Sequence, residues 1–195
     1  MKIVIATNNS AKFQQIIHGL KPLSHKYQFL SLNDINYHRP IQETQKTFAG
    51  NSLLKAKQVC KDTGYITIAE DSGLCVDALG GKPGVFTNRY GGLDTTRKVQ
   101  LTKLLNAIKG VNDPFRNAHF ISVVTCVFPN KKTIQTMGQL DGKLSKKIIN
   151  IDNGLTHDPI FIPAGYKVTM SKLTDDEKLK INHRGQALSK LIDKL

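Results

Sequence analysis

Residues 68–82 read Ile-Ala-Glu-Asp-Ser-Gly-Leu-Cys-Val-Asp-Ala-Leu-Gly-Gly-Lys, and this stretch guides the interpretation of the whole chain. A short apolar run at residues 65–69 has the composition of a buried strand, and Glu70, Asp71 and Ser72 follow it directly. Carboxylates at a strand end, beside a glycine that lets the backbone turn, are natural oxygen ligands for a hard cation such as Mg²⁺. A turn in which Asp and Ser cap a helix explains the same letters, so the pattern alone leaves both interpretations open.

Apolar periodicity on either side of this stretch predicts an alternation of strands and helices. Strands are predicted over residues 2–6, 28–32 and 65–69, helices over 10–20, 47–64 and 182–195, and a β-hairpin over 115–128 and 133–140. Because helices and strands interleave early and a hairpin follows, we expect an α/β or α+β fold with a mixed sheet. The length of 195 residues predicts one domain, or at most two.

Composition indicates a soluble globular protein, with 39% hydrophobic and 22% charged residues. No apolar run approaches the roughly 20 residues that a membrane helix needs, so we expect no membrane association. The three cysteines are far apart and lack CxxC spacing, which argues against zinc and against a disulfide framework. Buried, reduced thiols are typical of a cytoplasmic protein, and that location is the expectation.

The net charge of +13 points to an anionic partner but does not identify it. A spread positive field attracts nucleotides, nucleic acids and membrane surfaces alike, and a solvated basic surface is an equally good explanation. The aromatic residues do not interleave with basic ones as a nucleic-acid stacking platform requires, and no known RNA-binding motif is present. Nucleic acid is therefore not favoured as the partner.

Four loops carry polar residues suited to phosphate chemistry. The loop of residues 7–12 contains Thr7, Asn8, Asn9 and Lys12 at the start of a helix, where backbone N–H groups and a lysine can hold phosphate oxygens, although it lacks the P-loop glycines. Arg89 lies next to flexible glycines and suits a bidentate phosphate contact. The other two loops are residues 156–161, with His157 and Asp158, and residues 182–185, with His183 and Arg184.

The order of these motifs along the chain resembles the inosine triphosphate pyrophosphatases, also called the Ham1-like family. The matching segments are IVIATNNxxK at residues 3–12, TFxxNSLLKA at 47–56, AEDSGLCVDALGGKPGV at 69–85, RYGG at 89–92, DPIFIP at 158–163, LTDDEK at 173–178 and NHRGQAL at 182–188. The resemblance spans almost the whole chain. It implies an elongated ITPase-like fold of two lobes around a mixed sheet, a cleft between the lobes, and commonly a homodimer.

The family pattern also implies a role for each matching residue. It assigns catalysis to Asp71, and metal binding to Asp71, Glu43 and Glu70. Contacts with the triphosphate are assigned to Asn9, Lys12 and Lys55, and further substrate contacts to Ser72, Lys178, His183 and Arg184. The loop that meets the purine base consists of Leu155, Thr156, His157 and Asp158. The implied reaction converts a nucleoside triphosphate into a monophosphate and pyrophosphate, with Mg²⁺ neutralising phosphate oxygens.

The chain departs from the family pattern at several positions. Glu70 stands where the family usually has Asp, and Gln42-Glu43 replaces a pair of acids. The base loop reads Leu155-Thr156-His157-Asp158 in place of Phe-Gly-Tyr-Asp, which removes an aromatic face worth roughly 1–3 kcal/mol of stacking. We therefore expect a Mg²⁺-dependent pyrophosphatase for ITP, dITP and XTP. The alternative is a divergent member that binds nucleotide with altered base choice or little turnover.

Overall fold

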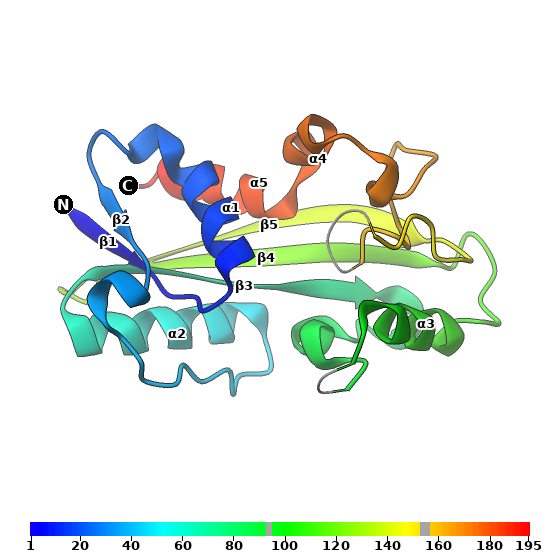
Figure 1. The fold of residues 1–195 in the computed structure, drawn as a ribbon, viewed down its shortest axis with the longest axis horizontal. Coiled ribbons are helices and arrows are strands. Elements are labelled where there is room, and N and C mark those ends of the chain that lie inside the picture. Colours follow the sequence, from blue (N-terminus) through cyan, green and yellow to red (C-terminus); the bar gives the residue numbers. More distant parts are fainter. Residues whose placement is uncertain (93–94, 153–156) are drawn as a thin grey trace. The chain divides into compact units, whose positions relative to one another are not determined.

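The computed structural model describes residues 1–92, 95–152 and 157–195. Within these residues a six-stranded sheet has the strand order β2-β1-β3-β4-β5-β6 (Figure 1). The strands are β1 (Lys2–Ile5), β2 (Gln28–Leu30), β3 (Ile66–Val76), β4 (Asn117–Val127), β5 (Thr133–Leu144) and β6 (Phe161–Pro163). Strand β1 pairs in parallel with β2 and β3, whereas β5 and β6 are antiparallel. The predicted mixed α/β class is confirmed.

The helices take up most of the segments predicted for them. They are α1 (Ser10–Leu20), α2 (Phe48–Thr63), α3 (Arg97–Ala107), α4 (Asp175–Ile181) and α5 (His183–Ile192). A 3₁₀ helix, η4 (Gly84–Arg89), lies in the glycine-rich segment after β3. No helix among the described residues is long and apolar enough to cross a membrane.

The chain divides into two compact units, and it passes from one to the other within β3, β4 and β5 and again between Asn182 and His183. Unit 1 consists of Met1–Ser72, Ser122–Gly138 and His183–Leu195, and unit 2 consists of Gly73–Ile121 and Gln139–Asn182. Each unit has its own hydrophobic core.

Unit 1 buries both faces of its part of the sheet. Helices α1 and α5 cover one face and α2 covers the other (Figure 1). Along β1 and the residue after it, Ile3 and Ile5 join the core under α1 and α5, while Val4 and Ala6 join the core against α2. This alternation follows from the two-residue period of a strand, and burial on both faces explains the continuous apolar run at the start of the chain.

Strand β3 continues the same alternation into the acidic residues. Ile68 packs in the core under α1 and α5, and Ala69 packs in the core against α2. The sequence predicted that this strand ends at Ala69, but β3 runs on to Val76, so that prediction was wrong. Glu70 and Asp71 therefore lie inside a strand, and neighbouring side chains in a strand point to opposite faces.

Helix ends and close packing fix the helices that flank β3 in unit 1. Thr47 caps α2 by accepting a hydrogen bond from the Gly50 N–H at 3.0 Å, and Gly64 ends the helix in a left-handed conformation with φ of 72°. Helix α5 lies so close to β5 that a Cβ on Gly138 would fall 2.0 Å from the carbonyl oxygen of His183. Glycine is the residue that permits this approach.

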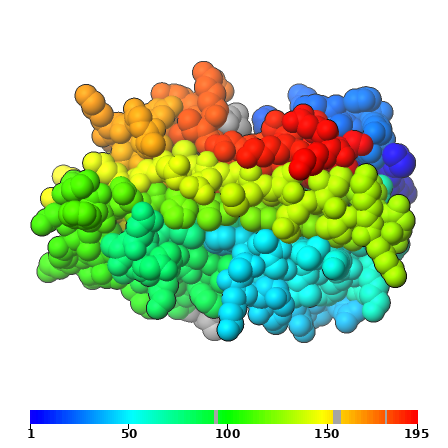
Figure 2. Space-filling model, turned by 180° about the vertical axis from the view of Figure 1, so that it is seen from behind, coloured from blue at the N-terminus to red at the C-terminus, as the bar shows by residue number. Residues whose placement is uncertain are grey.

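Unit 2 is organised around a core of side chains from β3, β4, β5, β6 and α3. Its fully buried members include Leu74, Leu101, Leu104, Leu144, Ile160 and Phe161. Strand β5 alternates strictly between buried and exposed residues over most of its length, and exposed residues of the yellow-green segment are visible in Figure 2. One face of β5 is therefore open to solvent.

Candidate functional site

The buried charges of unit 1 form two groups on opposite sides of β3. Glu70 points to the side covered by α1 and α5, and Asp71 points to the side covered by α2. Both residues are nearly inaccessible, with exposed fractions of 2% for Glu70 and 6% for Asp71. Buried carboxylates require charged or hydrogen-bonding partners, and each group supplies them.

The first group, here called the Glu70 cluster, consists of Lys12, Glu70, Ser122 and Arg184. Glu70 Oε2 lies 2.9 Å from Lys12 Nζ, and Oε1 accepts hydrogen bonds from Ser122 Oγ at 2.8 Å and from Arg184 Nε at 3.1 Å. Arg184 also donates to Ser72 Oγ at 3.2 Å. Two cations and one carboxylate leave the cluster with a formal charge of +1, which suits a polyphosphate.

Charge governs protonation within the Glu70 cluster. Burial by itself would raise the pKa of Glu70, but Arg184 and Lys12 outweigh it and hold that pKa well below its usual value. Burial, together with the positive charge of Arg184, lowers the pKa of the neighbouring His183 to about 3. Glu70 is therefore ionised and His183 is neutral near pH 7.

The second group, here called the Lys55 cluster, consists of Glu43, Asn51, Lys55 and Asp71. Lys55 Nζ lies 2.7 Å from Glu43 Oε1 and 3.2 Å from Asp71 Oδ1. Asn51 donates from Nδ2 to Asp71 Oδ2 at 3.1 Å, and its Oδ1 accepts from the Gln45 N–H at 2.9 Å. Two carboxylates and one cation give this cluster a formal charge of −1.

Asp71 has the properties of a general base. Burial raises its pKa above the usual value, the charge of Lys55 opposes that rise, and Glu43 adds to it. For Lys55, burial alone would lower the pKa, but Asp71 and Glu43 outweigh it and raise the pKa. A carboxylate of raised basicity beside a fixed ammonium ion can accept a proton from water.

The loop of Thr7, Asn8 and Asn9 shapes the start of α1. Thr7 Oγ1 accepts from the Asn9 N–H at 3.2 Å, and Asn9 Oδ1 accepts from the Lys12 N–H at 3.0 Å and so caps the helix. The first backbone N–H groups of a helix lack intrahelical partners and attract anions. The loop therefore sets Lys12 at a helix end that favours phosphate.

The predicted residues of unit 2 form contacts of their own. Asp158, with an exposed fraction of 3%, lies 3.5 Å from Lys178 Nζ. His157 is buried with its ring edge-on to Phe120, and burial lowers its pKa to about 4. Arg89 is exposed and stacks over the ring of Phe86. Two further predicted base-loop residues, Leu155 and Thr156, lie outside the described residues.

The carboxylates predicted to bind Mg²⁺ do not converge on one point. Among the residues that the structure describes, no group of three or more His, Cys, Asp or Glu side chains is placed to hold a metal ion. Glu43 and Asp71 do share a cation, the ammonium of Lys55, and so lie near enough to contribute to one hard-cation site. Glu70 does not fit that site, since it lies on the other side of the strand and its oxygens already contact Lys12, Arg184 and Ser122.

Three site residues were missed by the sequence analysis as functional candidates. Asn51 orients Asp71, Ser122 donates to Glu70, and Gln15 accepts a hydrogen bond from Arg184. Asn51 stands one helical turn before Lys55 in the TFxxNSLLKA segment, so the i, i+4 spacing on α2 was a usable signal. Ser122 and Gln15 have no comparable signal, because their roles depend on the pairing of distant segments.

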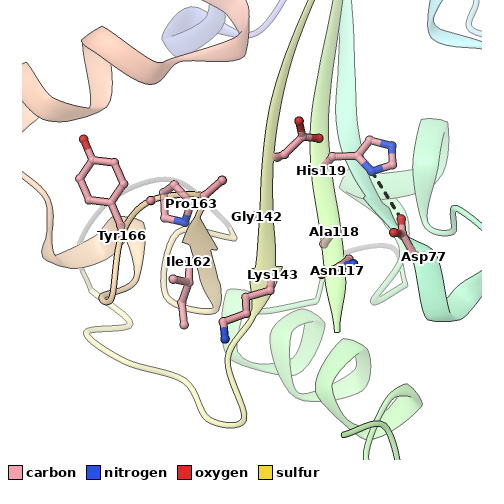
Figure 3. Close-up of a pocket in the computed structure, with 12 residues that line it drawn as sticks. Asp77, Asn117, Ala118, His119, Gly142, Lys143, Ile162, Pro163 and Tyr166 are labelled. Atoms are coloured by element: carbon pink, nitrogen blue, oxygen red, sulfur yellow. Dashed lines mark ion pairs between the residues drawn. The ribbon is translucent and has the colours of Figure 1, made fainter. Parts of the chain in front are cut away.

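A separate hollow of about 440 Å³ lies in unit 2 (Figure 3). It is lined by residues of β4, β5 and the segment around β6, and an ion pair of 3.5 Å between His119 and Asp77 lies on one side of it. None of the described residues predicted for the site contributes to its lining. The hollow is therefore distinct from the buried charge clusters of unit 1.

The chain is similar to known proteins over almost its whole length. The model of the Ham1 family matches residues 3–194, and the chain belongs to that family. A dITP/XTP pyrophosphatase of Bacillus licheniformis is 38% identical over 190 residues, covering 97% of this chain and 95% of the relative. One of Flavobacterium psychrophilum is 39% identical, covering 99% of this chain and 98% of the relative. The solved structure of a HAM1 protein from Coxiella burnetii aligns with a TM-score of 0.90 and 33% identity, covering 100% of this chain and 98% of that one.

Proposed function

We propose that this chain hydrolyses dITP, XTP and ITP to the nucleoside monophosphate and pyrophosphate, and so removes deaminated purines from the nucleotide pool. Membership of the Ham1 family and the names of full-length relatives support this activity. The observation that carries the proposal is Asp71, a buried carboxylate of raised pKa held between Lys55 and Asn51. It is the base that hydrolysis by water requires.

The reaction adds water across the bond between the α- and β-phosphates. Asp71 takes a proton from water as the water oxygen bonds to the α-phosphorus, and the P–O bond between the α-phosphorus and the leaving pyrophosphate breaks. Lys55 stabilises the carboxylate before the transfer, and the +1 Glu70 cluster, through Lys12, offsets negative charge on the phosphates. We also propose that His157, Asp158 and Lys178 contact the purine base of the substrate. Arg89 is proposed to contact its phosphates.

Mg²⁺ is part of this proposal. When bound, the ion would neutralise phosphate oxygens and polarise the scissile bond. Glu43 and Asp71 are the residues proposed to hold it, because a pair of carboxylates with waters and phosphate oxygens is the usual Mg²⁺ environment. Titration of turnover with Mg²⁺, and its loss on chelation, would test this role.

A homodimer, which the family resemblance implies, and a cytoplasmic location, which the three free thiols favour, also belong to the proposal. Light scattering coupled to gel filtration would show a mass of twice the 21.6 kDa chain. A monomer mass across the micromolar range would contradict the dimer.

The activity is tested by pyrophosphate release from dITP, XTP, ITP, ATP and GTP with and without Mg²⁺. We expect turnover of dITP, XTP and ITP and little of ATP or GTP. In Asp71→Asn, kcat should fall by about 10²–10⁴-fold, because the amide cannot accept the proton from water. Steady-state kinetics on protein of unchanged circular dichroism measures this effect.

Asp62→Asn is the matched control, since it also removes one carboxylate from unit 1. Asp62 pairs with Arg39 and Tyr37 at the surface, so its loss should leave kcat unchanged. Tight binding of ITP without any product would instead favour the alternative, a nucleotide-binding protein with little turnover. Equal activity of Asp71→Asn and the wild type would exclude Asp71 as the base.

A further inference from the structure

Glu70 and Asp71 are adjacent in sequence, but their side chains lie on opposite sides of β3. The partners of Asp71 come from α2, where Asn51 and Lys55 lie. The charged partners of Glu70 come from α1 and α5, which cover the opposite face (Figure 1). This separation is a direct result of the two-residue period of the strand. Two acids that look like one ligand pair in the sequence therefore have different surroundings.

The oxygens of Glu70 are engaged by cations and a hydroxyl group. Oε2 is 2.9 Å from Lys12 Nζ, while Oε1 contacts Ser122 Oγ and the Nε and Nη2 atoms of Arg184 at 2.8–3.1 Å. The side chain is 1% exposed. A metal ion at Oε2 would have to displace Lys12, and the carboxylate would then share its charge between the metal and buried Arg184.

We propose that Glu70 is an internal counter-ion that positions Lys12 and Arg184 for the polyphosphate and does not ligate the metal. The assignment of a polyphosphate rests on the proposed function, whereas the contacts of Glu70 do not. Glu70 is thus a positioning residue that acts through two cations.

The physical need for such a residue comes from the two cations themselves. Lys12 reaches the cluster from α1 and Arg184 from α5, and without Glu70 two like charges would repel each other in a buried place. Arg184 is held in addition by Ser72 and Gln15, so its guanidinium plane is fixed. Lysine carries three donors, and only one is needed for Glu70, so Lys12 can contact phosphate while it keeps this ion pair.

Glu70→Gln tests the proposal because it keeps the shape of the side chain and removes its charge. With XTP as substrate we expect kcat to fall by about 10- to 100-fold, since displaced cations no longer match the transition state. KM should not rise, because the cluster charge increases from +1 to +2. The Mg²⁺ concentration for half-maximal turnover should stay within about twofold of the wild type, as expected for a residue outside the metal site.

Binding of Mn²⁺, followed by electron paramagnetic resonance in the absence of nucleotide, separates the two roles without turnover. We expect Glu70→Gln to bind Mn²⁺ as the wild type does and Asp71→Asn to bind it more weakly. Loss of Mn²⁺ affinity in both variants would overturn the proposal, because Glu70 would then be a ligand.

A purely structural role predicts another pattern, namely a lower Tm with kcat and KM unchanged per folded molecule, and that result would also overturn the proposal. If Glu70→Gln does not fold, Glu70→Asp is the second variant. It retains the charge but withdraws the carboxylate by one methylene, so kcat should fall less than 10-fold with Mn²⁺ affinity unchanged. An unaltered kcat, or a weakened Mn²⁺ affinity, in this variant would contradict positioning.

Failure of the proposed function would look different from failure of this inference. If the wild type releases no pyrophosphate from any substrate, the proposed function is wrong, and calorimetry with pyrophosphate still tests Glu70. Glu70→Gln should then bind pyrophosphate at least as tightly as the wild type at low salt, with a steeper loss of affinity as salt rises. Weaker binding at low salt would reject the counter-ion role, and Asp62→Asn controls for the loss of one negative charge.

Discussion

At the scale of single residues, Asn51 fixes the orientation of the Asp71 side chain, the proposed general base. Its Oδ1 accepts the Gln45 N–H, so its Nδ2 must face Asp71, and it donates there at 3.1 Å. An amide whose two ends have different partners has only one satisfactory orientation. Asn51 is 1% exposed, so water cannot take its place without a change in packing.

Asn51→Asp should reduce kcat/KM for XTP by about 10- to 100-fold with only a small change in fold. The new carboxylate keeps the acceptor for Gln45 but cannot donate to Asp71, and it places a like charge about 3 Å away. Steady-state kinetics measures the loss. Ser52→Ala is the matched control on the same helix, because Ser52 bonds to Thr125 and not to the charge clusters. Its kcat/KM should remain that of the wild type, and an equal fall in both variants would refute the role of Asn51.

The positions of the acids were predictable from sequence, but their directions were not. Glu43, Glu70 and Asp71 were all selected as metal ligands from the family pattern, and the strand before Glu70 was expected to end at Ala69. Cationic partners from distant segments let a strand keep two buried carboxylates, and no local pattern reveals that pairing. The sequence identified Lys12, Lys55 and Arg184 as cations of the site, but it could not say which acid each would meet.

At the scale of secondary-structure elements, Arg116 joins the end of α3 to the end of β5. Arg116 is 3% exposed, and its guanidinium donates to the carbonyl oxygens of Ile108, Val111, Leu144 and Ser145 at 2.7–3.1 Å. Carbonyl groups near a helix C-terminus carry partial negative charge, which favours a cation there. One side chain thus satisfies backbone groups that two elements leave open at their ends.

Arg116→Met should lower the free energy of unfolding by about 3 kcal/mol, because several buried carbonyl groups lose a donor. The free energy of unfolding of Arg116→Lys should lie between the values of the wild type and Arg116→Met, since an ammonium cannot reach all four acceptors of the guanidinium. Urea unfolding followed by circular dichroism measures both. Arg39→Met, which breaks an exposed ion pair with Asp62, should change stability by less than about 1 kcal/mol. A comparable effect in Arg39→Met and Arg116→Met would contradict this account.

Elements with strong periodicity or clear caps were predicted well. Helix α1 begins and ends at the predicted residues, and α2 lies between its Thr47 cap and Gly64 as expected. The end of β3 was misplaced because charged residues usually indicate a turn. Here Glu70 and Asp71 lie within the strand and form buried ion pairs. The base loop could not be compared in full, because Leu155 and Thr156 lie outside the described residues.

At the scale of the whole molecule, the stability of the fold depends on pH, because histidines are buried in their neutral form. The pKa of His157 is lowered from an ordinary 6.5 to about 4 by burial, with a further contribution from Arg97. Below pH 6.5 the unfolded chain binds a proton at this residue and the folded chain does not. Stability is therefore lost as the pH falls from about 6.5 towards 4, and it is unaffected above that range.

Between pH 7 and 5 the free energy of unfolding should fall by about 2 kcal/mol more in the wild type than in His157→Gln, which cannot titrate. Urea unfolding at the two pH values gives this difference. His38→Gln, a change at an exposed histidine, should keep the wild-type dependence on pH. If His157→Gln shows the same decrease as the wild type, His157 is not buried in its neutral form.

The total charge of +13 says less about the molecule than the way in which buried charges are grouped. The sequence predicted an anionic partner from that total, but the site consists of one cluster of charge +1 and another of −1. Folding sorts the same residues by strand face, so the sum over the chain cannot show where a polyanion would bind.

The alternation along β3 makes the order of residues 70 and 71 as important as their identity. A slip of the strand by one position would turn the aspartate towards Lys12 and the glutamate towards Lys55, exchanging the two environments while every amino acid stayed present. Insertions before residue 70 in this strand should therefore be far more damaging than insertions of equal length in the exposed turn between β4 and β5, at residues 129–131. The two environments thus depend on the spacing of residues along the strand as strictly as on its composition.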